Sequence, residues 1–320
     1  MPNVTNQRLQ HDLFPFGTDT ELVRGIVPFL REGVADGQPA IIVATPADAA
    51  LLREGLGPHA DRVLVIDSDA WYLRPAATIA DYDSVLRELT DGGGAQVRLA
   101  GQLPQTMTPG ERLSWTRYES VLNRAFQDRP VWVVCMYDSR VEAQRAMLDD
   151  ALRTHPTVWK DGARRPSPRF LDPEALLSEL PEPTIRPAAG PALRLRVDRD
   201  PDGWRERVAA AGVHGGLRRE RVDEFLVAIS EVVANAVQHG APPVELAAWV
   251  TPGEIVCEVS DHGGGAIGPL AGYLPPESDA TATGDGPPRG MGLWIARQLS
   301  DTLAVRSGRD RTTVRLGVSA

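Results

Sequence analysis

The chain has 320 residues, 42% of them hydrophobic, and can therefore bury two cores of ordinary size. Its formal net charge of −9 argues against general binding to nucleic acid or to an anionic membrane, because both need a basic protein surface. The start of the chain lacks the pattern of a signal peptide, and no apolar run approaches the roughly 20 residues of a membrane-spanning helix, so we expect a cytoplasmic protein.

The first half of the chain alternates between helical and strand patterns. Residues 21–32 have apolar side chains at helical spacing, and the apolar run 39–44 has the character of a buried strand. Thr45 follows this strand as the N-cap of a helix that extends to residue 54. The remaining predicted elements are strands over 62–66 and 131–136 and helices over 79–89 and 112–126. This alternation favours a mostly parallel sheet with helices on both faces.

Proline-rich sequence follows the first half. Eight prolines occur between residues 156 and 191, and the one short helical pattern in this stretch covers 172–180. Such sequence is typical of a linker with limited secondary structure. We therefore predict domains over 10–157 and 193–320, joined by a linker over 158–192.

The second half has a different order of elements. Strand patterns at 193–197, 243–250 and 254–260 surround a long helical pattern over 223–239. A polar stretch rich in glycine and proline covers 263–289, and a helix over 291–299 and strands over 303–307 and 312–318 complete the domain. Because antiparallel strands and helices are segregated, this domain is predicted to be an α/β sandwich.

Cys135 and Cys257 are the chain's two cysteines, and each lies within an apolar run. We interpret both as buried thiols in a reducing compartment. A disulfide framework and a metal cluster built from cysteines are not expected.

A polar stripe lies on the predicted helix over 223–239. Glu231, Asn235 and His239 are spaced by four residues, so their side chains point in about the same direction. Burying them among apolar neighbours is costly unless each has a partner, and a nucleotide with its metal ion would supply one. Taken alone, the stripe is more often a solvated helix face.

A carboxylate and three glycines follow the predicted strand over 254–260. Asp261 stands at the strand end, and Gly263 and Gly265 allow a flat base to approach the backbone while the carboxylate accepts a hydrogen bond from its amine. Taken alone, this pattern more often indicates a structural turn.

Glycines also open the helix predicted over 291–299. Gly290 and Gly292 leave N–H groups exposed at the positive end of the helix dipole, which favours an anion. The alternative for this motif alone is a tight turn.

The order of the three motifs resembles that of the GHKL ATPases, which share the Bergerat fold and include histidine kinases, gyrase, heat-shock chaperones and anti-sigma kinases. The resemblance implies that the domain binds ATP with Mg²⁺. Asn235 would coordinate Mg²⁺, and Glu231 would orient or deprotonate the attacking hydroxyl. Asp261 would hold the adenine amine, with Gly263 and Gly265 beside the base.

The remaining positions of the motif receive their roles from the same resemblance. Gly290, Gly292 and Leu293 belong to the phosphate-binding segment, beneath a lid over 266–289. Thr312 or Thr313 would complete the adenine end, and His239 would shape the end of its helix. Arg289 is placed by its charge and position to reach a phosphate, which is our inference rather than part of the family motif.

Within this superfamily, the segments ISEVVANAVQHG and GMGLWIARQLSD most resemble those of the switch kinases, which bind sigma factors and phosphorylate a Ser or Thr of an antagonist protein. The implied partners are a sigma factor, a STAS-domain anti-anti-sigma protein, or both. One alternative is an ATP-dependent module that sequesters a sigma factor without catalysis. Another is an atypical histidine kinase, although proline-rich sequence stands where its dimerising helices would be. A homodimer stays among the open alternatives for the oligomeric state.

The first half contains no phosphate-binding loop of the Gly-x-x-x-x-Gly-Lys type. Asp138 ends the run VWVVCMYD as in a degenerate RecA-like sheet, although an aspartate at a strand end more often caps the next turn. Residues 10–157 resemble the MEDS sensory domain. The resemblance is carried by His11, the segments WTRYE and LN at 115–119 and 122–123, and Thr154-His-Pro. The sequence departs from that family at Met136 and in the segment QLP at 102–104, which lacks an acidic residue. The resemblance implies a RecA-like α/β/α domain that receives a small molecule or another signal, with His11, Tyr137 and Asp138 as candidate pocket residues.

Overall fold

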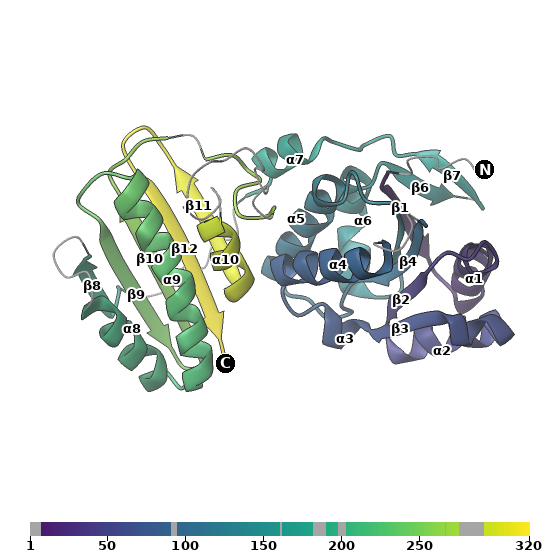
Figure 1. The fold of residues 1–320 in the computed structure, drawn as a ribbon, viewed down its shortest axis with the longest axis horizontal. Helices are drawn as coiled ribbons and strands as arrows, with labels where there is room; N and C mark the ends of the chain where they lie inside the picture. Colours follow the sequence, from purple (N-terminus) through teal and green to yellow (C-terminus); the bar gives the residue numbers. More distant parts are fainter. Residues whose placement is uncertain are drawn as a thin grey trace. The chain divides into compact units, whose positions relative to one another are not determined.

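The computed structural model describes residues 8–90, 95–160, 162–181, 190–197, 203–265, 267–274 and 291–320. The chain divides into two compact units, Met1–Leu180 and Pro181–Ala320 (Figure 1). Within the described ranges, no helix is both long enough and apolar enough to cross a bilayer.

The first unit is built on a seven-stranded sheet in the order β3-β2-β4-β5-β1-β6-β7. Strands β1 to β6 pair in parallel, and β7 pairs antiparallel with β6. The strands are β1 (Gln10–Phe16), β2 (Ala40–Ala44), β3 (Val63–Asp67), β4 (Val97–Gln102), β5 (Val131–Asp138), β6 (Thr157–Lys160) and β7 (Ala163–Pro166).

Helices cover both faces of this sheet, as expected for parallel strands that are buried on both sides. The helices are α1 (Asp19–Ala35), α2 (Pro46–Leu56), the 3₁₀ helix η1 (Gly57–Arg62), α3 (Ser68–Trp71), α4 (Pro75–Thr90), α5 (Pro109–Ala125), α6 (Glu142–Thr154) and α7 (Pro173–Glu179). Val134 and Met136 of β5 pack in one core with α1 and α2. The alternate residues Val133 and Cys135 face α4 and α5. The α/β/α architecture predicted from the sequence is confirmed.

Local sequence signals set several helix starts. The Thr45 side chain accepts a hydrogen bond from the Asp48 N–H, and Pro46 is the first residue of α2. At α5, Thr108 and Glu111 form a capping box in which each side chain accepts the other's backbone N–H. These caps satisfy N–H groups that have no partner within the helix.

The first unit contains elements that the sequence analysis did not predict. β1 and β4 are strands with buried polar residues, among them His11 and Arg98, and α6 was also missed. Residues 158–180, which we assigned to the linker, form most of β6 and all of β7 and α7 within the first compact unit. Proline is compatible with these elements because Pro166 ends an edge strand and Pro173 opens a helix.

The second unit has a five-stranded antiparallel sheet in the order β11-β12-β10-β9-β8. Its strands are β8 (Leu193–Arg196), β9 (Glu245–Thr251), β10 (Glu254–Asp261), β11 (Thr302–Ser307) and β12 (Thr312–Ser319). Its helices are α8 (Gly203–His214), α9 (Arg219–His239) and α10 (Met291–Leu299). Alternate residues of the strands form one core with α8, α9 and α10, so this unit is the predicted α/β sandwich.

Candidate functional site

The packing of α10 on α9 brings two of the predicted motifs together. A Cβ atom added at Gly292 would lie 2.8 Å from Asn235 Nδ2 and 3.1 Å from Glu231 Oε2. A side chain at the second residue of α10 would therefore have to displace the ends of these two side chains of α9. No described residue forms a hydrogen bond with the side chain of Glu231 or Asn235, and both are half-buried. Both side chains lie beside the first turn of α10.

The end of α9 also lies against the end of β10. The buried Asp261 accepts a hydrogen bond through Oδ1 from Gly263 N at 2.7 Å, and Ala241 N lies 3.4 Å from the same atom. A Cβ atom at Gly240 would overlap the Asp261 carboxylate, and one at Gly263 would lie 2.8 Å from Oδ1. No described residue donates a hydrogen bond to Oδ2, so this oxygen can accept one from a ligand.

The two predicted threonines differ in their placement. Thr312 pairs with Asp261 across β10 and β12, and its hydroxyl donates to the carbonyl of Gly263 at 3.2 Å. Thr312 shares its sheet face with Val314, which packs in the core beneath the helices. Thr313 points to the opposite face because successive strand residues alternate. Of the two, Thr312 shares the sheet face of Asp261, and the adenine-binding role of either threonine stays a prediction.

The glycines after Asp261 also differ from one another. Gly265 is exposed, and a Cβ atom there would meet nothing within 4 Å, so its backbone packing does not require glycine. A Cβ atom at Gly264, in contrast, would overlap the carbonyl oxygen of Arg309. This requirement for glycine cannot be inferred from the local sequence because the partner, Arg309, comes from the distant β11–β12 turn.

The other predicted site residues make no described contact with Glu231, Asn235 or Asp261, or lie outside the described residues. His239 is the exposed last residue of α9, and Leu293 is half-buried against the core. Arg289, Gly290 and most of the lid lie outside the described residues and stay predictions. The sequence analysis missed Arg297, whose guanidinium donates to the Ala271 and Leu303 carbonyls.

A second group of polar residues is buried in the first unit. His11, Glu119, Cys135 and His155 each offer one ligand atom, and these atoms all lie within 4.8 Å of one another. Their side chains belong to residues that are between 0% and 6% exposed. Tyr137, a predicted pocket residue, reaches Glu119 Oε1 with its hydroxyl at 3.5 Å.

Burial shapes the charge state of this group. Burial alone would raise the pKa of Glu119, but the hydrogen bond with His11 and the electrostatic influence of the two nearby imidazoles outweigh burial, so its pKa lies below the ordinary value. Burial and the neighbouring His11 lower the pKa of His155 to about 3. Burial and the adjacent Glu119 carboxylate raise the pKa of the Cys135 thiol. Near pH 7 the group therefore contains a carboxylate and a neutral His155.

Asp138 does not belong to this group. Its carboxylate pairs with Arg140, whose Nη2 lies 2.8 Å from Oδ2, and accepts the backbone N–H of Arg140 at 2.9 Å. This is the turn-capping role that we considered as the alternative for Asp138.

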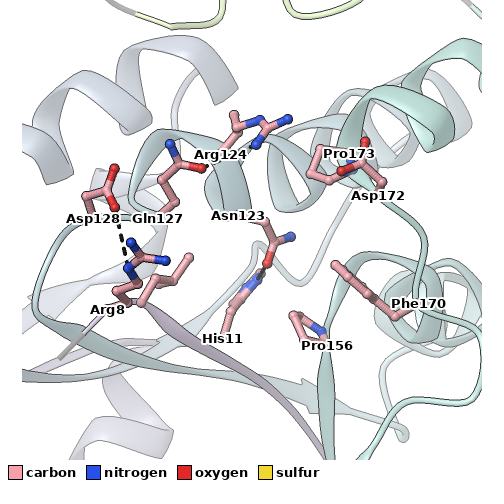
Figure 2. A pocket seen from close by; sticks show the side chains of 11 residues that line it. Arg8, His11, Asn123, Arg124, Gln127, Asp128, Pro156, Phe170, Asp172 and Pro173 are labelled. Atoms are coloured by element: carbon pink, nitrogen blue, oxygen red, sulfur yellow. Dashed lines mark hydrogen bonds and ion pairs between the residues drawn. The ribbon is translucent and has the colours of Figure 1, made fainter. Parts of the chain in front are cut away.

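A pocket of about 320 Å³ opens beside this group. Figure 2 shows His11 and Asn123 on its wall, with the ion pair of Arg8 and Asp128 on another side. Phe170, from the segment before α7, also lines the pocket. Of the predicted pocket residues, His11 alone lines it.

Comparison with family models gives a match for each unit. Residues 10–156 match MEDS, the methanogen/methylotroph, DcmR sensory domain. Residues 199–318 match the histidine kinase-like ATPase domain. A comparison with curated protein sequences finds no match.

Two solved structures are among those similar to this chain. The crystal structure of the RsbU and RsbW domains of Rv1364c from Mycobacterium tuberculosis is 20% identical, with a TM-score of 0.28, and the match covers 40% of this chain and 32% of that chain. The histidine kinase AdeS from Acinetobacter baumannii is 14% identical, with a TM-score of 0.23, and the match covers 31% of this chain and 46% of that chain. The chain thus spans about a third of the first structure's length and about half of the second's.

Proposed function

We propose that this chain, which carries a MEDS domain followed by a histidine kinase-like ATPase domain, is a regulatory switch kinase. In this proposal the second unit binds ATP with Mg²⁺ and transfers phosphate to a Ser or Thr of a STAS-domain anti-anti-sigma protein, or holds a sigma factor. The first unit receives the signal that controls this activity. The observation that supports it most is the close approach of Gly292 to Glu231 and Asn235.

The donor set fits a magnesium nucleotide. The Asn235 amide oxygen is a hard ligand of the kind that Mg²⁺ prefers, and it lies on the same helix face as the Glu231 carboxylate. Asp261 presents an unoccupied carboxylate oxygen for the adenine amine. Bound Mg²⁺ would neutralise charge on the phosphates during transfer.

The role proposed for Glu231 is to orient the attacking Ser or Thr hydroxyl and accept its proton. A general base must lie within hydrogen-bonding reach of that proton, and Glu231 is one helical turn from Asn235, the proposed magnesium ligand. Arg289 and Gly290 are proposed to contact the phosphates.

Phosphate transfer is tested with radiolabelled ATP and purified STAS-domain proteins. We expect acid-stable label on the partner, no transfer by Glu231→Gln, and retained ATP binding by that variant in calorimetry. Label that is acid-labile and stays on this chain would instead indicate a histidine kinase. ATP binding without transfer to any STAS-domain protein would contradict the kinase assignment.

The non-catalytic alternative has its own test. If ATP only prepares a surface that captures a sigma factor, Glu231→Gln should capture sigma factors as the unmodified chain does. Asp261→Asn should lose both ATP binding and capture.

A further inference from the structure

The buried group in the first unit has the composition and spacing of a metal site. His11 Nε2 lies 3.2 Å from Glu119 Oε2 and 3.3 Å from Cys135 Sγ, and Cys135 Sγ lies 3.5 Å from the same carboxylate oxygen. His155 Nε2 is also 3.5 Å from Glu119 Oε2. A tetrahedral zinc ion with bonds of about 2.0–2.3 Å places its ligand atoms about 3.3–3.8 Å apart. Four of the six separations are therefore already close to the required values, and the two between His155 and His11 or Cys135 are no more than 4.8 Å.

Hydrogen bonds to Asn123 fix the orientation of the His11 ring. Asn123 Nδ2 contacts three carbonyl oxygens, those of Glu119, Ser120 and Thr154, at 2.7–3.3 Å. Its Oδ1 must therefore face His11 Nδ1, 3.1 Å away, and accept a hydrogen bond from it. His11 consequently carries a proton on Nδ1 and directs Nε2 at the other three ligand atoms.

The ring of His155 is oriented in the same way. Its Nδ1 lies 2.8 Å from the carbonyl oxygen of Ala151, which can only accept, so Nδ1 carries the proton. The opposite nitrogen, Nε2, is fully buried and has no hydrogen-bond partner among the residues that the structure describes. Nε2 lies 3.5 Å from Glu119 Oε2 and therefore points at the other ligand atoms. A buried polar atom without a partner is unfavourable, and a cation at the centre of the group would supply that partner.

We propose that His11, Glu119, Cys135 and His155 bind one divalent transition-metal ion of the borderline class, with Zn²⁺ the best fit. Imidazole, thiolate and carboxylate are all zinc ligands, whereas Mg²⁺ and Ca²⁺ take oxygen ligands. Binding displaces to solvent the thiol proton of Cys135 and the proton that His11 Nε2 shares with Glu119, so the thiolate and the Glu119 carboxylate together balance the charge of the ion.

The neighbouring contacts support a closed site. The bond of Asn123 to His11, the Ala151 carbonyl at His155 and the Tyr137 hydroxyl at Glu119 are the outer contacts that commonly orient metal ligands. Four protein ligands fill a tetrahedral shell, which is the arrangement of a structural rather than a hydrolytic site. The ion would join β1, α5, β5 and the residue after α6. The pocket beside His11 and Asn123 gives the ion a route from solvent.

The site is tested on the full chain with Zn²⁺ and Co²⁺ as probes. The chain is stripped with a chelator and titrated, and we expect one ion per chain and a thiolate-to-cobalt charge-transfer band. Cys135→Ser should lose this band. Cys257→Ser is the matched control because Cys257 is also fully buried but lies in the second unit, and it should keep both the band and the stoichiometry.

A further variant separates metal binding from a folding defect. Asn123→Ala leaves all four ligands in place and should weaken Zn²⁺ binding by about 10–100-fold. Circular dichroism and urea unfolding report whether each variant is folded. A stripped chain that binds no Zn²⁺ and gives no cobalt–thiolate band would overturn the proposal, and so would a band that persists in Cys135→Ser. Neither result depends on kinase activity.

Discussion

The close approach of α10 to α9 makes Gly292→Ala a sharp test of the nucleotide site. A Cβ atom there would lie 2.8 Å from Asn235 Nδ2, whereas ordinary contact begins at 3.4 Å, so the Asn235 amide must move by about 0.6 Å (3.4 − 2.8). The Glu231 carboxylate, 3.1 Å from the added carbon, must yield by about 0.3 Å (3.4 − 3.1). Both obstructing groups are the ends of side chains rather than backbone.

The substitution should therefore impair binding more than folding. Moving two side-chain ends costs less than the about 1–3 kcal/mol of overpacking a core, and alanine regains about 0.5–1 kcal/mol of helix propensity over glycine. Because a 1 Å misplacement of a catalytic group can cost about 100-fold, a shift of about 0.6 Å should reduce ATP·Mg²⁺ affinity or turnover roughly tenfold.

Calorimetry with ATP and Mg²⁺ and thermal unfolding are the two measurements. Gly110→Ala is the matched control because Gly110 is also the second residue of a helix, α5, and a Cβ atom there meets nothing within 4 Å. Wild-type nucleotide affinity and turnover in Gly292→Ala would refute the assignment of Glu231 and Asn235 to the nucleotide site.

Three further predictions concern both units. Asp261→Asn should bind ATP at least about tenfold more weakly in calorimetry. If the amide oxygen keeps the hydrogen bond from Gly263 N, the amide NH₂ faces the adenine amine, and two donors then oppose each other. Gly264→Ala should destabilise the second unit by about 1–3 kcal/mol in urea unfolding, because the Arg309 backbone cannot move as a side-chain end can. The pKa of His155 is about 3 in the folded chain and about 6.5 in the unfolded chain. Between these pH values the unfolded chain binds a proton that the folded chain does not, so the free energy of unfolding decreases as the pH falls. In urea unfolding with a chelator present, this residue should lower the free energy of unfolding by about 2 kcal/mol between pH 7 and pH 5. The variant His155→Gln should not show this decrease.

Sequence patterns predicted the elements whose signals are local. The start of α2 is encoded by Thr45 and Pro46 within four residues of the chain, and the structure confirms the cap. The core-facing strands β2 and β5 are continuous apolar runs, so their burial could be inferred without knowing their neighbours.

β1 shows why other elements could not be predicted. It lies between β5 and β6, yet its second and third residues are His11 and Asp12, and Asp12 is fully buried. The Asp12 carboxylate accepts hydrogen bonds from the indoles of Trp132 and Trp159, each at 2.8 Å, and from Arg164. These partners follow more than 100 residues later in the chain, so the compensation for burying the charge is invisible to any local pattern.

The same contrast separates the two candidate sites. In the second unit, Glu231 and Asn235 share one helix, and Asp261 is placed by the strand-end glycines beside it, so short motifs contain most of the geometry. In the first unit, His11 and His155 are 144 positions apart and meet only because β1 lies next to β5 and β6 in the sheet. Two distant thiols do not by themselves form a metal cluster, whereas one thiol combined with two imidazoles and a carboxylate can bind an ion. Such a set becomes recognisable only when the sheet order and the orientation of each ring are known.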